Sequence, residues 1–75
     1  MSFEEAQEAF YDDWSLIMYD AVHSFEEDRY FQLGLTKSLK LVVVVFCIRN
    51  KNIIRVISAR FATRKETEEY EKQRN

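Results

Sequence analysis

One stretch of this sequence constrains the fold more than any other. Residues Leu41–Ile48 are eight consecutive apolar side chains, and four of them are valine. β-Branched residues favour extended backbone, and a strand that is apolar on both faces has to be covered on both faces. The stretch therefore predicts a central β-strand between two layers. It is too short for a membrane-spanning helix, which needs about 20 apolar residues, so we expect no membrane association.

Three further strands are predicted around this one. Trp14–Tyr19 is rich in large apolar residues, Arg29–Thr36 alternates between two faces, and Ile53–Arg60 is the last apolar run. Turns at residues 37–39 and 49–52 are too short for the crossover that parallel strands require. We expect a four-stranded antiparallel meander.

Both ends of the chain carry helix-start signals. A Ser or Thr stands three residues before a Glu at Ser2 with Glu5 and at Thr63 with Glu66, which is the pattern of a capping box. The first helix should end at residues 12–13 and the second at about Lys72, with Tyr70 packed on the sheet. With 75 residues there is room for one domain. The predicted class is α+β: a four-stranded antiparallel sheet flanked by an N-terminal and a C-terminal helix.

Charge is segregated along the chain. Residues 1–28 hold nine acidic side chains and no Lys or Arg, whereas residues 29–65 hold nine basic side chains and no acidic one. Such asymmetry creates a local field that the net charge of −2 conceals. One interpretation is a cationic surface that meets phosphate. The other is internal neutralisation, in which the acidic N-terminal segment folds over the basic segment that follows it. The two interpretations are compatible.

The sequence lacks the residues that several kinds of site require. One Cys and one His cannot form a disulfide framework or a structural zinc site, and one Gly cannot make a phosphate-binding loop. Cys47 lies inside the valine-rich strand, where core packing is the default. We expect no metal or cofactor. The single Cys and the acidic, non-apolar start fit a cytoplasmic protein.

The remaining side chains suit RNA cleavage without a metal ion. In that reaction a 2′-hydroxyl attacks the adjacent phosphate and charge accumulates on the phosphoryl oxygens. The planar guanidinium of Arg fits those oxygens, and His, Glu, Lys or Tyr can transfer the protons.

Three segments carry a resemblance to a known family. They are Glu27–Gly34, the run Ile-Ile-Arg-Val-Ile-Ser-Ala-Arg that begins at Ile53, and Ala62–Glu66. Together with Ser2–Ala6 they resemble the BrnT family, ribonuclease toxins of bacterial type II toxin–antitoxin pairs with a RelE-like fold. The resemblance covers almost all of the chain. It implies a BrnA-type antitoxin with a ribbon-helix-helix region, and a complex that represses its own operon.

This sequence departs from the family pattern at its N-terminal end. Family members usually begin with a strand and a helix before the segment that matches Ser2–Ala6, so we expect either a short gene start or a truncated member. If that strand pairs with the sheet in relatives, an uncovered edge is left, and such an edge invites self-association or a partner strand. A catalytically inactive RNA-binding or antitoxin-binding module and a purely structural domain are therefore the alternative functions. A homodimer and a toxin–antitoxin heterotetramer are the expected assemblies.

The resemblance and the basic region together select the candidate site residues. We expect Arg60, Arg49, Arg29 and His23 to be catalytic, and Arg55, Arg64, Lys65 and Lys51 to bind RNA. The alternatives are an ion pair with an acidic helix residue for Arg60, a solvated turn for Arg49, pairing with nearby acids for Arg29, and a solvated loop for His23. Glu66 is expected to be a cap rather than a base.

Strict alternation adds one constraint on the last strand. It places Arg55 with Ile57 and Ala59, and Arg60 on the opposite face with Val56 and Ser58. Unless a bulge intervenes, only one of the two arginines should belong to a site.

Overall fold

A computed structural model of the chain describes residues 1–25, 27–50 and 52–74. Its elements, in chain order, are α1 (Phe3–Gln7), the 3-10 helix η1 (Glu8–Tyr11), β1 (Leu16–Tyr19), β2 (Asp28–Leu35), β3 (Leu41–Arg49), β4 (Ile53–Phe61) and α2 (Arg64–Arg74). None of the helices in these ranges is both long enough and apolar enough to cross a membrane.

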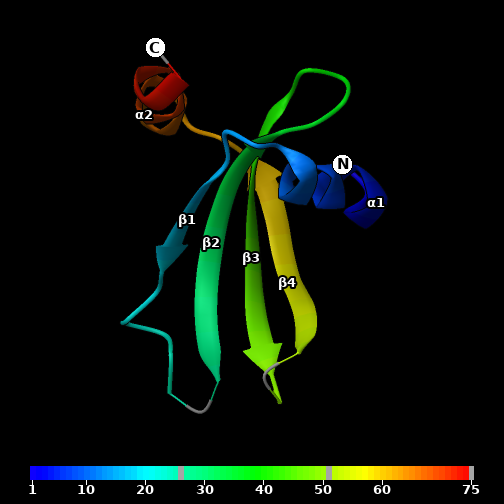
Figure 1. Ribbon diagram of the computed structural model, residues 1–75, viewed down its shortest axis with the longest axis vertical. Coiled ribbons are helices and arrows are strands. Elements are labelled where there is room, and N and C mark those ends of the chain that lie inside the picture. The colour runs from blue at the N-terminus through cyan, green and yellow to red at the C-terminus, as the bar shows by residue number, and fades with distance from the viewer. Residues whose placement is uncertain (26, 51, 75) are drawn as a thin grey trace.

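The four strands form one antiparallel sheet in the order β1-β2-β3-β4, as Figure 1 shows. The predicted meander and the α+β class are confirmed. β3 has a neighbour on each side, and every residue from Val42 to Cys47 is buried. The valine-rich run is thus the centre of the fold, because it is the strand that can lose water on both faces.

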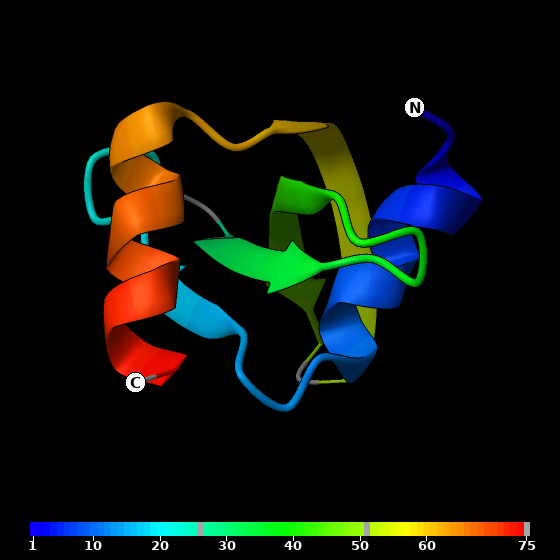
Figure 2. The same cartoon turned by 90° about the horizontal axis from the view of Figure 1, so that it is seen from above.

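The two helices lie on opposite faces of the sheet (Figure 2). Ala6 and Ala9 of α1 and η1 pack on Val42 and Val44. On the other face, Tyr70 of α2 is 3% exposed and packs with the buried side chains Leu33 and Val43, as expected from the sequence. Successive residues of β3 therefore contribute to two separate core clusters, one for each layer.

The N-terminal segment differs from the single helix that was expected. The α-helix ends at Gln7 and the chain continues as η1 to Tyr11, where the N–H of Asp12 donates to the carbonyl of Ala9. Such tightening is common at helix ends. The first strand begins at Leu16 rather than Trp14, because the N–H of Trp14 donates to the side chain of Asp12 in a turn.

β4 contains a bulge, which was the condition under which Arg55 and Arg60 would not face opposite sides. Val45 lies opposite Ser58, and Phe46 lies opposite Val56, so Ile57 is an extra residue on β4. The expected strict alternation along this strand is wrong. Arg55 lies opposite Cys47 and Arg60 opposite Val43, two positions of β3 with the same parity. The bulge therefore places both arginines on one face of the sheet, the face that α2 partly covers.

α2 covers only part of that face. The residues packed around Tyr70 belong to the end of the sheet where β2 turns into β3, and both helices lie near this end in Figure 1. Neither of the helices in the described part of the chain packs on the opposite half of the face, which borders the connection between β1 and β2. Arg29 and Arg55 lie on this open half.

Candidate functional site

The candidate site is a surface pocket of about 380 Å³ on the open half of the sheet. Its base is a row of directly paired residues across three strands: Arg29 on β2, Cys47 on β3 and Arg55 on β4. Neighbouring strands lie about 4.8 Å apart, so the two arginines start roughly 10 Å from each other with a small side chain between them. The other lining residues are His23, Phe25, Glu27 and Ile57. We call this the Arg29–Arg55 pocket.

The floor of the pocket between the two arginines is buried. Cys47 is 5% exposed, and the Arg29 side chain is partly buried. The Nε of Arg29 is buried and has no hydrogen-bond partner among the described residues. A cation over a low-dielectric floor interacts more strongly with an anion than one in open water. The arrangement therefore favours an anion between the two guanidinium groups.

His23 lies in the connection between β1 and β2 and borders the same pocket. Its Nδ1 is 2.8 Å from the Oδ2 atom of Asp20, and its side chain is more than half exposed. Asp20 is buried, and its Oδ2 is also 3.6 Å from the Nε of Arg29. An imidazole held by a carboxylate thus lies beside two guanidinium groups, a set that combines proton transfer with anion binding.

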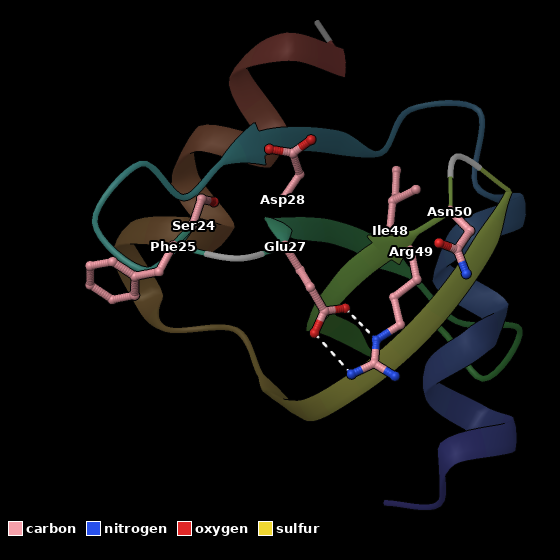
Figure 3. Close-up of a pocket in the computed structure, with 7 residues that line it drawn as sticks. All are labelled: Ser24, Phe25, Glu27, Asp28, Ile48, Arg49 and Asn50. Atoms are coloured by element: carbon pink, nitrogen blue, oxygen red, sulfur yellow. Dashed lines mark hydrogen bonds and ion pairs between the residues drawn. The ribbon is translucent and has the colours of Figure 1, made fainter.

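Arg49 lies at the end of β3 in a neighbouring pocket, shown in Figure 3. Its Nε and terminal nitrogen donate to the carboxylate of Glu27 at 2.5 and 3.0 Å. These hydrogen bonds lower the pKa of Glu27 and raise that of Arg49. Glu27 borders both pockets, so Arg49 is held at the rim of the Arg29–Arg55 pocket rather than inside it.

Arg60 lies on the same face as Arg55 but nearer to α2. Its two terminal nitrogens donate to Glu66 at 2.7 and 2.9 Å. Glu66 also accepts from the N–H of Thr63, whose hydroxyl accepts from the N–H of Glu66, so the predicted capping box is present. The hydrogen bonds from Arg60, with those from Thr63, lower the pKa of Glu66 to about 2. Glu66 is a cap, and Arg60 forms the ion pair that was its alternative role.

Two of the remaining basic candidates lie on α2, away from the pocket. Arg64 is almost fully exposed and lies 3.7 Å from Glu68 on α2. Lys65 is exposed in the first turn of the same helix. Lys51 lies outside the described residues. Since Arg29, Arg49 and Arg60 each face a carboxylate, the basic region is partly neutralised within the chain.

Two residues at the pocket, Asp20 and Phe25, were not among the candidates that the sequence indicated. Asp20 precedes the only His by three residues, and that spacing is a signal for a carboxylate–imidazole contact in a turn. Phe25 is 87% exposed and borders both pockets, and in Figure 3 its ring points away from the other labelled side chains. Nothing in its local pattern distinguishes it from a core aromatic. In the described ranges, no three His, Cys, Asp or Glu side chains gather closely enough to ligate a metal ion.

The fold and the pocket define a small α+β domain that carries a cationic, histidine-containing site on an open sheet face. The family model described as "Ribonuclease toxin, BrnT, of type II toxin-antitoxin system" matches residues 1–66. The chain therefore belongs to the BrnT family of ribonuclease toxins, and a type II system implies an antitoxin as its partner. Comparison with curated proteins gave no significant match.

Proposed function

We propose that this chain is an endoribonuclease that cleaves mRNA without a metal ion and so inhibits translation in the cytoplasm. The observation that carries the proposal is the row Arg29–Cys47–Arg55 with His23 beside it in one pocket. Membership in a family of ribonuclease toxins supports it. We also propose the RelE-like assignment of the fold, which the four-stranded antiparallel sheet with a helix at each end supports.

In the proposed reaction the scissile phosphate lies between the guanidinium groups of Arg29 and Arg55. The 2′-oxygen forms a bond to phosphorus while the bond from phosphorus to the 5′-oxygen breaks. The proton of the 2′-hydroxyl passes to His23, and the departing 5′-oxygen takes a proton from solvent. The products are a 2′,3′-cyclic phosphate and a 5′-hydroxyl. The arginines stabilise the charge that develops on the phosphoryl oxygens, which is commonly the largest contribution to such catalysis.

The other basic side chains extend this surface for RNA. We propose that Arg60 and Arg49 contact phosphates on either side of the scissile one, Arg60 from the α2 end and Arg49 from the rim. Arg64 and Lys65, which lie on α2, make further contacts with the RNA backbone. Lys51 is also proposed to bind RNA.

The exposed aromatic beside the pocket favours a single-stranded substrate. Phe25 presents its ring at the border of both pockets, where an unpaired base can stack on it. Bases in a duplex have no free face to offer.

We propose that the antitoxin is of the BrnA type and covers the same surface. An antitoxin that supplied acidic side chains to Arg29 and Arg55 would exclude the phosphate by direct competition. The resulting complex would be a heterotetramer if each toxin bound one antitoxin within an antitoxin dimer.

The test is cleavage of a short RNA by the purified chain with EDTA present. We expect a cyclic phosphate product, and no product when the cleaved nucleotide carries a 2′-deoxy sugar. Arg55→Ala should lower kcat by about 100-fold, because removing one group that stabilises the transition state commonly costs this much. Lys72→Ala, which removes an equal charge from exposed α2, is the matched control and should leave kcat unchanged.

Two results would point elsewhere. Binding of RNA without cleavage, weakened by salt, would favour the binding module over the enzyme. Cleavage that EDTA abolishes would contradict the metal-independent mechanism.

A further inference from the structure

We propose that Asp20 is the positioning residue of the site, which holds His23 with its proton on Nδ1 and leaves Nε2 free to accept the proton of the 2′-hydroxyl. The inference rests on the proposed function for the identity of that proton. The orientation of the ring rests on the geometry around Asp20 alone.

Asp20 is held firmly at the end of β1. Its N–H donates to the carbonyl of Arg29 at 2.8 Å, which extends the pairing of β1 with β2 by one residue. Its own carbonyl accepts from the hydroxyl of Ser24 at 2.6 Å, and that hydroxyl accepts from the N–H of Arg29 at 2.9 Å. The turn that carries His23 is therefore closed onto β2 by hydrogen bonds at both of its ends.

The carboxylate of Asp20 is 6% exposed and faces two basic side chains. Its Oδ1 accepts from the backbone N–H of His23 at 3.3 Å, and its Oδ2 is 2.8 Å from Nδ1 of the same residue. Oδ2 is also 3.6 Å from the Nε of Arg29. One buried carboxylate thus restrains the imidazole and the stem of a guanidinium that lines the pocket.

This contact selects the tautomer of the imidazole. An ionised carboxylate only accepts hydrogen bonds, so Nδ1 must carry the hydrogen in this contact. In the neutral ring the lone pair is then on Nε2. A buried carboxylate that fixes a histidine in this way makes the free nitrogen a better defined proton acceptor, as in the carboxylate–histidine pairs of other sites.

The test uses the fact that His23 is the only histidine of the chain. Protein labelled with ¹⁵N at histidine gives one pair of ring nitrogen signals, measured at about pH 8, where an ordinary imidazole is neutral. We expect the wild type to show a protonated Nδ1 and an unprotonated Nε2. Asp20→Asn, whose amide can donate to Nδ1, should shift the pattern towards Nε2–H and lower kcat by about 100-fold, the share that proton transfer commonly supplies.

The control is Asp13→Asn, which removes the same charge at an exposed position outside the site and should leave both the spectrum and kcat as in the wild type. A wild-type ring with the Nε2–H tautomer overturns the inference, and this spectrum decides the matter even if Asp20→Asn fails to fold. If the wild type cleaves RNA and Asp20→Asn cleaves it equally well, the positioning role is also overturned. A wild type with the expected tautomer and no cleavage would instead contradict the proposed function and leave the orientation of His23 established.

Discussion

The guanidinium of Arg60, near the end of β4, forms two hydrogen bonds of 2.7 and 2.9 Å with the carboxylate of Glu66, in the first turn of α2. This contact ties the helix to the sheet across the short link at residues 62–63. Arg60 therefore contributes to stability, whatever it contributes to RNA binding. Measurements on Arg60 variants need a stability control before an effect on cleavage is interpreted.

The first prediction concerns acid stability. The pKa of Glu66 is lowered from 4.5 to about 2, chiefly by the hydrogen bonds from Arg60. The contribution of this pair is therefore present above about pH 4.5 and is lost as the pH falls towards 2. Glu66→Gln, which keeps a capping side chain, should cost about 1 kcal/mol at neutral pH. Urea unfolding at a series of pH values should show the two stability curves converging through this window.

The control for that experiment is Glu69→Gln, which removes the same charge from an exposed position of α2. A stability difference between Glu66→Gln and the wild type that does not change with pH would contradict the linkage.

The second prediction concerns Tyr70 and Asp12, which join α2 to the turn before β1. The hydroxyl of Tyr70 donates to Oδ2 of Asp12 at 2.5 Å. Burial, together with this carboxylate, raises the pKa of Tyr70 to about 12. Burial alone would raise the pKa of Asp12, but hydrogen bonds from Tyr70 and from the N–H groups of Trp14 and Leu35 outweigh it and lower that pKa.

Tyr70→Phe should therefore cost about 2 kcal/mol, the usual contribution of a hydrogen bond to a charged group. Because the pKa of Tyr70 is raised and that of Asp12 is lowered from 3.8, this contribution is complete between about pH 4 and pH 10 and is lost as the pH rises through 12. An absorbance titration should show one of the four tyrosines ionising later than an ordinary phenol, and Tyr70→Phe should remove that step. Unchanged stability in Tyr70→Phe would show that the hydrogen bond contributes nothing net.

The third prediction concerns the contact between η1 and β2. A Cβ atom added at Gly34 would lie 2.7 Å from the carbonyl oxygen of Ala9 and 2.9 Å from its Cβ. Since these atoms belong to a packed helix, Gly34→Ala should cost about 2–3 kcal/mol through overpacking. Urea unfolding of the double variant with Ala9→Gly should recover only part of this, because the carbonyl oxygen remains. Full recovery would place the clash at the side chain alone.

The fourth prediction concerns the exposed ring at the pocket border. Phe25→Ala should weaken binding of a short single-stranded RNA by about tenfold, since stacking of one base contributes about 1–3 kcal/mol. Phe25→Trp should retain the affinity, measured by fluorescence anisotropy. Tyr11→Ala removes an equally exposed aromatic from η1, on the other side of the sheet, and should have no effect. Equal losses in both alanine variants would indicate a general surface effect.

Much of the fold could be read from local pattern. The apolar run at Leu41–Ile48, the two capping boxes and the short turns predicted the meander and its terminal helices, because each depends on residues close in sequence. The observed ends of the helices and strands differ by a few residues from the predicted ones. At the N-terminus the difference arises because Asp12 takes hydrogen bonds from Trp14, Leu35 and Tyr70, two of which are distant in the chain.

Local sequence patterns predicted less of the candidate site than of the fold. The sequence identified Arg29, His23 and Arg55 as candidates, but it gave Arg60 and Arg49 greater weight than Arg55. For Arg60 the sequence offered an ion pair with an acidic helix residue as the alternative role, but it gave no partner for Arg49. The pairing of β2 with β3 brings Glu27, which precedes the first residue of β2, beside Arg49 at the end of β3. Asp20 likewise became a site residue only through its contacts with His23 and Arg29.

The sequence by itself therefore determined the class of fold, the central strand and the concentration of positive charge between residues 29 and 65. The tertiary structure decided which of those basic side chains lie on the same face of the sheet. Side chains alternate along an unbroken strand, and that rule separates Arg55 from Arg60. The extra residue Ile57 restores them to one face, and a bulge of this kind is defined only by pairing with β3. Long-range pairing thus placed on one face two arginines that local periodicity had assigned to opposite sides, and it brought Arg55 into one row with Arg29 and Cys47.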